Sequence, residues 1–259
     1  MINNKTSFVI LIDTNAMAAL SLYVEGCTTV EVALGTPDEG LKSKFKETKD
    51  TKDTQLYFAE REGGGISDGY RLFKYLKDKI EVYDTVQIWF SLLSQIELLH
   101  LFLERTFDIE LTRKGIPYRI RRKNYFRTQI DFDFKSKISD YWEDQKKRLG
   151  EQDIEFKNPE KGNGAIQEII KIAEIVTRYV ALEPVDLYLY ASGIYLRADE
   201  IYSRDLEFRS IINKICTDIE WRNIRDNIQD DLRKFIKSFE DEHQKEGRIR
   251  LPKGVTSLR

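Results

Sequence analysis

The hydrophobic pattern begins with an uninterrupted apolar run, Phe8-Val9-Ile10-Leu11-Ile12, which ends at Asp13. Five consecutive apolar residues are typical of a strand buried on both faces of a parallel sheet, because the run is too short for a helix. We therefore predict a strand at residues 7–13 and a helix at about 15–24, which Thr14 or Asn15 can cap. Residues 85–90 are rich in β-branched and aromatic side chains and predict a second buried strand.

Apolar residues three and four positions apart predict helices at 70–80, at about 92–105 and at 163–182, the last capped by Asn163. The apolar stripe expected on this last helix is Ile166, Ile169, Ile170, Ala173, Val176 and Val180. Pro184 opens a further helix, residues 200–203 predict a short strand, and Asp205 precedes a helix that ends near Lys214. Strands that alternate with helices indicate an α/β fold with a parallel sheet.

Two segments interrupt this alternation. Residues 35–66 are polar and end in Gly63-Gly64-Gly65, so we predict a loop-rich insertion whose triglycine is a hinge. Residues 110–160 form a second insertion, with a β-hairpin at 116–134 that turns near Lys123. We predict one domain over residues 1–259, with insertions at about 25–84 and 108–162.

The C-terminal extension, residues 219–259, begins with a long helix predicted at about 219–245. Its apolar stripe consists of Trp221, Ile224, Ile228, Leu232, Phe235 and Phe239. A packing helix is the commoner use of such a stripe, and a homodimer or an accessory-protein contact is the alternative. The basic residues from Gly247 onward are expected to be frayed.

Composition narrows the function classes. The 259 residues carry a net charge of −2, so attraction to nucleic acid must come from local patches. Two cysteines exclude a disulfide framework, and two histidines disfavour a histidine-based metal cluster or a Ser-His-Asp site. No apolar stretch approaches the roughly 18 residues of a membrane span, and the N-terminus is not a signal peptide. We expect a cytoplasmic protein that does not bind membranes.

Candidate chemistry resides in four acidic residues, Asp13, Glu97, Asp186 and Asp205. Asp13 ends a predicted buried strand, and ligands of open α/β sheets bind at that end of the strands. Carboxylates without histidine or cysteine suit hard cations such as Mg²⁺ or Mn²⁺. Taken singly, Asp13 and Asp205 are better explained as helix caps, and Asp186 as a first-turn acid favoured by the helix dipole.

The four acids in order give the chain its resemblance to the PIN-domain nucleases. The matching blocks are Leu11-Ile12-Asp13-Thr14-Asn15, Ser91 to Leu98 around Glu97, Val185 to Ala191 around Asp186, and Ile201-Tyr202-Ser203-Arg204-Asp205. The resemblance implies a three-layer α/β/α fold with a central, mostly parallel sheet. It also implies Mg²⁺ or Mn²⁺ held by the four acids. Glu97 would orient a metal-bound water or bind a second ion, and Asn15 and Ser203 would fix the carboxylates.

The chain departs from the family pattern in its spacing. Asp13 and Glu97 lie farther apart than in compact members, the gap from Glu97 to Asp186 is long, and Ser203 replaces the commoner threonine. The resemblance covers residues 7–24, 86–106 and 184–219, and therefore says nothing about the insertions or the C-terminal helix.

A basic segment in the second insertion is the candidate nucleic-acid surface. Its cations are interleaved with Tyr118, Tyr125 and Phe126, an arrangement that suits a single strand whose bases stack on aromatic rings. We assign binding to Arg119, Arg121, Arg122, Lys123 and Arg127. The solvated face of a hairpin, or a docking patch for an acidic protein, explains the segment as well.

Together these observations predict a metal-dependent endonuclease. RNA is favoured over single-stranded DNA by analogy with the family. The insertions suggest that the enzyme reads a specific substrate or docks to a larger machine, such as a stress or defence system. The alternatives are a non-catalytic nucleic-acid-binding or scaffold protein on the same fold and a hydrolase of small nucleotides.

Overall fold

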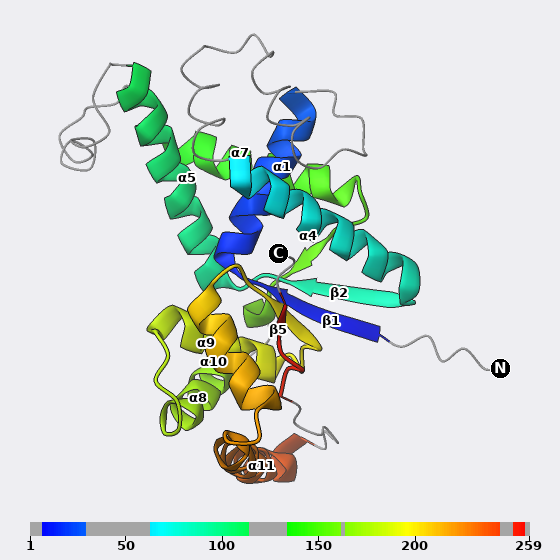
Figure 1. The fold of residues 1–259 in the computed structure, drawn as a ribbon, viewed down its shortest axis with the longest axis vertical. Coiled ribbons are helices and arrows are strands. Elements are labelled where there is room, and N and C mark those ends of the chain that lie inside the picture. The colour runs from blue at the N-terminus through cyan, green and yellow to red at the C-terminus, as the bar shows by residue number, and fades with distance from the viewer. Residues whose placement is uncertain (1–6, 30–62, 114–133, 162–163, 244–250, 257–259) are drawn as a thin grey trace. The chain divides into compact units, whose positions relative to one another are not determined.

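The predicted strands pair into one parallel sheet in the computed structural model (Figure 1). The structure describes residues 7–29, 63–113, 134–161, 164–243 and 251–256. Its strands are β1 (Ser7–Ile12), β2 (Thr85–Trp89), β3 (Phe156–Lys157), β4 (Glu200–Tyr202) and β5 (Val255–Thr256). Their order is β3-β2-β1-β4-β5, and every pair is parallel. The predicted α/β class and parallel sheet are confirmed.

The central strand β1 is buried on both faces. Alternate residues of a strand point to opposite faces, and Phe8, Ile10 and Ile12 on one face are at most 3% exposed. Leu11, on the other face, is fully buried within the main hydrophobic core. This double burial explains the continuous apolar run and is what a three-layer α/β/α arrangement requires.

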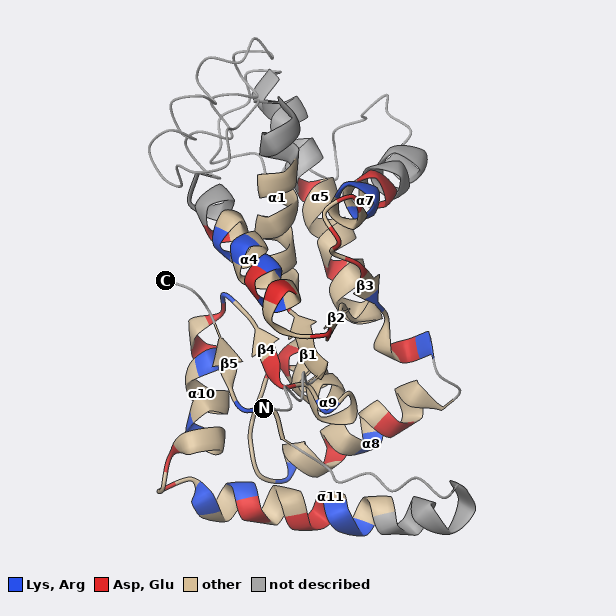
Figure 2. Cartoon of the chain, turned by 90° about the vertical axis from the view of Figure 1, so that its right-hand side faces the viewer, with Lys and Arg blue, Asp and Glu red and all other residues tan. Residues whose placement is uncertain are grey.

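Four helices build the core beneath the Leu11 face. They are α8 (Ala165–Thr177), α9 (Pro184–Tyr195), α10 (Leu206–Thr217) and α11 (Arg222–His243). Ile228 and Leu232 of α11 are fully buried, and Trp221, Ile224 and Phe235 pack partly against the same core. The predicted C-terminal stripe therefore packs on its own chain from Trp221 to Phe235. Figure 2 shows the charged residues carried along α11.

The chain divides into two compact units. The sheet unit comprises residues 1–16, 77–95 and 155–259, and the second unit comprises residues 17–76 and 96–154. Helices α1 (Thr14–Thr29), α4 (Gly63–Val82) and α5 (Leu92–Arg113) run from one unit into the other, and α7 (Phe134–Gly150) belongs to the second. None of the helices in the described ranges is both long and apolar enough to cross a membrane.

Within the second unit, α1 and α4 approach closely at Gly69. A Cβ atom at Gly69 would lie 2.0 Å from the backbone oxygen of Ala19 and 2.8 Å from Cβ of Tyr23. The Tyr23 ring lies 5.5 Å from that of Tyr70 and 5.3 Å from that of Phe73. Glycine is therefore required here, because it lets the backbone of α4 approach the backbone of α1.

Two predictions about the insertions were wrong, one for the last residues of the predicted loop and one for the last residue of the predicted hairpin. Gly63-Gly64-Gly65 forms the first residues of α4 and is neither a loop nor a hinge. Glycine has a low helix propensity, but the packing of the rest of α4 outweighs it. Phe134, predicted in a hairpin strand, begins α7, since Trp142, Gln145 and Leu149 are buried at helical spacing. The remainder of the hairpin lies outside the described residues.

The stripe predicted for α8 was also wrong in part. Ile166 and Ile170 are 42% and 45% exposed, whereas Ile172 and Ile175 are buried with Ile169 and Val176. The helix begins after Gly164, with φ of 81° at this N-cap, and it ends at Thr177 rather than at 182. The predicted cap Asn163 is not among the described residues. An isoleucine-rich helix offers two overlapping stripes, and pattern alone does not choose between them.

The expectation of a frayed C-terminal tail was wrong for residues 251–256. Val255 is 5% exposed and belongs to β5, which pairs with the edge of β4. The side chain of Asn213 in α10 accepts a hydrogen bond from the Val255 backbone nitrogen at 2.8 Å and donates to its oxygen at 3.2 Å. A two-residue strand is too short to give a periodic signal, so its sequence did not reveal it.

Candidate functional site at the carboxyl edge of the sheet

The sheet topology singles out one place for a ligand. From β1 the chain adds β2 and then β3 on one side, and it later returns to add β4 on the other side of β1. The carboxyl ends of β1 and β4 therefore flank a topological switch point, where open α/β sheets bind their ligands. Asp13 follows β1, and Ser203 follows β4.

Asp13 is a buried carboxylate with both oxygens engaged. It is 5% exposed. The Thr14 backbone nitrogen donates to Oδ1 at 2.6 Å, and the Ser203 hydroxyl donates to Oδ2 at 2.7 Å. Its own backbone nitrogen donates to the oxygen of Tyr202 at 3.0 Å, which extends the β1–β4 ladder by one residue. These bonds compensate for the cost of burying a polar group and fix the carboxylate at the switch point.

Ser203 connects Asp13 to Asp205. The serine is fully buried, and its Oγ accepts a hydrogen bond from the Asp205 backbone nitrogen at 3.0 Å. Asp205 is the N-cap of α10, and its Oδ1 accepts from the Phe208 nitrogen at 2.9 Å. The structure thus brings together Asp13, Ser203 and Asp205, and the serine orients one carboxylate while it holds the backbone of the other.

Asp186 lies in the same unit, in the first turn of α9. Pro184 occupies the start of this helix, as predicted, and Asp186 is half-buried two residues later. This position suits a metal ligand at a helix start, and it equally suits an acid that interacts favourably with the helix dipole.

The remaining predicted site residues lie on α5 and α1 or outside the described residues. Glu97 is half-buried on α5 and belongs to the second unit, and Asn15 is exposed on the first turn of α1. The predicted nucleic-acid-binding residues Arg119, Arg121, Arg122, Lys123 and Arg127 lie outside the described residues.

The carboxylates at the switch point offer the oxygen ligands that a hard cation requires. Within the described ranges, no three His, Cys, Asp or Glu residues gather as a metal-binding group. Mg²⁺, however, is commonly held by one or two carboxylates together with waters and substrate phosphates. Asp13 follows β1, and Asp205 caps the helix that follows the neighbouring strand β4. Linked through Ser203, they supply two such carboxylates, so their chemistry fits this ion.

Sequence reasoning missed polar residues at the carboxyl ends of β2 and β3. Ser91 caps α5, since its Oγ accepts from the Ser94 nitrogen at 3.0 Å. The Thr14 hydroxyl donates to the Ser94 backbone oxygen at 3.4 Å. This cap was readable from the sequence, because Ser91 directly follows a predicted strand and precedes a helix.

Glu160 is the second residue that was missed. Both of its oxygens lie 3.1 Å from the Leu92 backbone nitrogen, and the Tyr188 hydroxyl donates to Oε1 at 3.0 Å. Burial, and then the charge and hydrogen bond of Glu160, raise the pKa of Tyr188, so this phenol remains a proton donor. Only Asn158-Pro159 hinted at a turn here, and nothing in the pattern linked Glu160 to α5.

Comparisons of the chain with known protein families, with curated proteins and with solved structures find no match. The interpretation of this edge therefore depends on its residues and topology.

Proposed function

We propose that this protein is a metal-dependent endonuclease that hydrolyses phosphodiester bonds, with RNA as the favoured substrate. The observation that carries the proposal is the buried carboxylate of Asp13 at the switch point, hydrogen-bonded to Ser203, which in turn bonds the Asp205 backbone. A buried acid costs free energy to maintain, and its placement at the carboxyl ends of β1 and β4 suits ligand binding better than stability alone.

Asp13 and Asp205 are the residues that would hold Mg²⁺ or Mn²⁺, with Asp186 from the start of α9 as a further ligand. Such an ion, when bound, lowers the pKa of a water and neutralises charge on the phosphate. Ser203 would keep the Asp13 carboxylate oriented, as ligand-supporting residues do in metal sites.

Cleavage assays test the proposal directly. Labelled single-stranded RNA, single-stranded DNA and duplex DNA are incubated with the wild type, with Asp13→Asn and with Asp186→Asn, in Mn²⁺, Mg²⁺ or EDTA. The matched control is Asp230→Asn, which changes an exposed acid of α11. We expect RNA cleavage that requires the metal, persists in the control and falls by at least a hundredfold in both site variants.

Circular dichroism checks whether Asp13→Asn still folds, since that side chain is buried. Asp186 is half-buried, so Asp186→Asn keeps the test decisive if the first variant unfolds. Equal cleavage by wild type and folded variants, or cleavage that survives EDTA, would contradict the proposal.

The second candidate is a non-catalytic nucleic-acid-binding or scaffold protein on the same fold. It is favoured by one observation, that no group of three potential metal-ligating residues is formed within the described part of the chain. This candidate predicts that RNA binds without being cut in any metal and that Asp13→Asn and Asp186→Asn bind RNA as the wild type does.

A further inference from the structure

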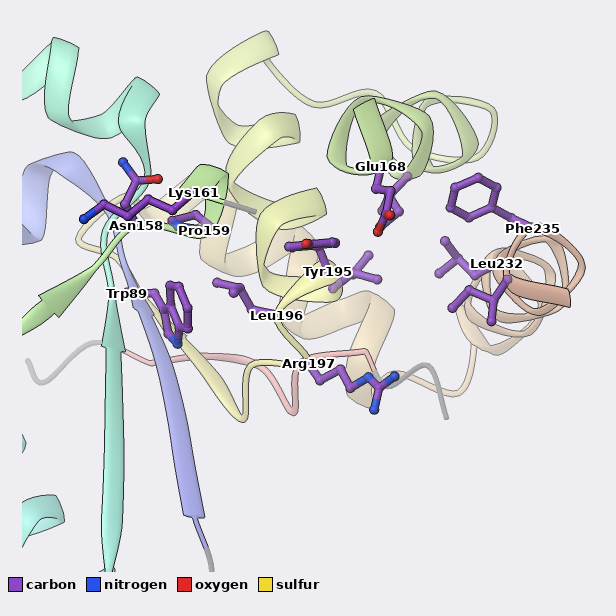
Figure 3. A pocket seen from close by; sticks show the side chains of 13 residues that line it. Trp89, Asn158, Pro159, Lys161, Glu168, Tyr195, Leu196, Arg197, Leu232 and Phe235 are labelled. Carbon is purple, nitrogen blue, oxygen red and sulfur yellow. The ribbon is translucent and has the colours of Figure 1, made fainter. Parts of the chain in front are cut away.

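A groove of about 640 Å³ runs over the sheet unit, among β2, the turn at Pro159–Lys161 (η2), α8, the end of α9, and α11. Figure 3 shows that Trp89, Tyr195 and Phe235 follow one another along it, with Asn158 at the Trp89 end. The groove is elongated, so it suits an extended chain better than a compact molecule.

The end of the groove at Asn158 lies beside the carboxyl edge of the sheet. In the parallel register, Lys157 pairs with Trp89, and Trp89 pairs with Leu11. Asn158 directly follows β3, and Asp13 comes two residues after Leu11 on the strand that flanks the other side of β2. A chain that occupies the groove would therefore lead towards the Asp13 carboxylate.

Three aromatic rings enter the groove from three different elements. Trp89 comes from β2, Tyr195 from α9 and Phe235 from α11, and each residue is half-buried. The Nε1 edge of Trp89 is buried, so its exposed part is the remainder of the ring. A partly exposed ring offers a surface on which another planar group can stack. The bases of a single-stranded nucleic acid stack on such rings.

Two of these rings have a lysine ammonium close to them. Lys157 Nζ lies 5.8 Å from the centroid of the Trp89 ring, and Lys171 Nζ lies 5.8 Å from that of the Phe235 ring. Both lysines are exposed. Each ring therefore has a positive charge at the distance at which a nucleotide carries a phosphate beside its base.

The third ring, Tyr195, is followed two residues later by Arg197, which also lines the groove. Arg197 is exposed, as is Lys161 at the other end of the groove, and neither makes an ion pair within the described ranges. Glu168 is the single acid among the described lining residues. The groove is thus bordered by separated cations that have no acid of their own chain to pair with.

We propose that this groove holds a single-stranded segment of the RNA substrate and leads it to the carboxyl edge of the sheet. The inference rests on the proposed nuclease function, since the strand is taken to the Asp13 site. Successive bases would stack on the three rings, and the backbone phosphates would pair with the cations beside them. A repeat of ring and cation along the groove matches the repeat of base and phosphate along RNA. A peptide would need an acidic residue at each of these places.

Fluorescence anisotropy of the whole chain with a labelled ten-nucleotide RNA tests the proposal. EDTA is present, so that nothing is cut and the proposed metal site does not contribute. The same sequence is also presented as a duplex, whose bases are already stacked on one another. We expect the single strand to bind at least tenfold more tightly than the duplex. Equal binding of the two, or no binding of the single strand, would overturn the proposal.

The double variant Lys161→Gln/Arg197→Gly tests the cations. It should weaken binding of the single strand by about tenfold and lower the salt slope by about 1.4, at roughly 0.7 per phosphate contact. Arg197 has a φ of 55°, which glycine adopts at lower energy, so this change should not lower the melting temperature. The control Arg233→Gln/Lys234→Gln removes two exposed cations of α11 that do not line the groove. Equal affinities in the two double variants would refute the assignment and would favour a docked peptide.

The variant Tyr195→Leu tests the stacking. Leucine keeps an apolar side chain but removes the ring, so binding of the single strand should fall by about tenfold while binding of the duplex is unchanged. The control Tyr179→Leu replaces a half-buried tyrosine that does not line the groove. An equal loss for single strand and duplex would show that Tyr195 does not stack on bases.

Failure of the nuclease function is recognised separately. If the wild type bound single-stranded RNA through the groove but cut it in no metal, the groove assignment would stand and the nuclease would fall. If metal-dependent cleavage were found and the groove variants had the same KM as the wild type, the nuclease would stand and the groove assignment would fall.

Discussion

The hydroxyl of Ser203 donates to one acid while it accepts from the backbone of another. Ser203→Ala would leave Oδ2 of the buried Asp13 carboxylate without this donor, and we expect a loss of about 1–3 kcal/mol in the free energy of unfolding. Urea denaturation measures the change. Ser203→Thr keeps the hydroxyl and should lose less. If alanine and threonine behaved alike, the hydroxyl would not support Asp13.

Cys216 is a thiol whose reactivity the structure suppresses. Burial raises its pKa to about 11, against a partly opposing effect of Arg225, and its Sγ donates to the Pro252 oxygen at 3.1 Å. Because the thiolate is the nucleophile, alkylation by iodoacetamide at pH 8 should be slow in the native protein and fast in urea. The experiment uses Cys27→Ser, so that only Cys216 reacts. Rapid native labelling would contradict the assigned burial.

The raised pKa of Cys216 also makes the stability of the fold depend on pH. The folded pKa of Cys216 lies above its usual value of 9.0, so the folded state favours the protonated thiol. This contribution is present below pH 9 and declines as the pH rises from about 9 to 11. Cys216→Ala should flatten the decline of the melting temperature over that window, and an unchanged slope would show that other groups cause it.

Among the elements, α1 and α4 depend on Gly69. Gly69→Ala places a Cβ atom 2.0 Å from the Ala19 oxygen, so the helices must separate, and a loss of about 1–3 kcal/mol or more is expected. Gly150→Ala is the matched control in the same unit, since nothing lies within 4 Å of its added Cβ. Thermal melts compare the two. Equal melting temperatures would mean that α1 and α4 do not pack at Gly69.

The edge strand β5 is held by the Asn213 side chain of α10 in addition to its pairing with β4. Asn213 makes both a donated and an accepted hydrogen bond with the Val255 backbone. Asn213→Ala should release β5, with faster amide exchange at Val255 and unchanged exchange in β1. Asn213→Asp retains the acceptor for the Val255 nitrogen and should be intermediate. Protection of Val255 in the alanine variant would show that the strand pairing alone is sufficient.

Sequence patterns predicted the elements that are marked by a long apolar run, a helix-opening proline or a capping residue. The apolar run before Asp13, the opening of α9 by Pro184 and the cap at Asp205 were all readable locally and were found as expected. The short strands β3 and β5, the burial of Ile172 in place of Ile166, and the contacts of Glu160 depend on partners distant in sequence. No local pattern encodes such contacts. The hydrogen bond between Ser203 and Asp13 is also distant, and only the family resemblance anticipated it.

At the scale of the whole molecule, the net charge of −2 gives little attraction for a polyanion. If RNA binds through the basic segment, the triple reversal Arg121→Glu, Arg122→Glu, Lys123→Glu should weaken binding and reduce the salt slope by about 2, at roughly 0.7 per phosphate contact. The control reverses Lys146, Lys147 and Arg148 of α7, a consecutive basic triplet with acidic neighbours. Equal affinities and slopes in the two variants would refute the assignment.

The parallel pairing of β1 with β4 has a consequence for when the candidate site comes into existence. Asp13 and Ser203 are separated by 190 positions, and the intervening chain includes the whole of the second unit. Contacts between residues so far apart in sequence form late and slowly. The chain loses the conformational entropy of a long loop before the contact stabilises it. A chain emerging during synthesis would carry an Asp13 that has no Ser203 to hold it. The carboxyl edge would therefore be assembled only when β4 docks, which would delay any activity there until the sheet is essentially complete.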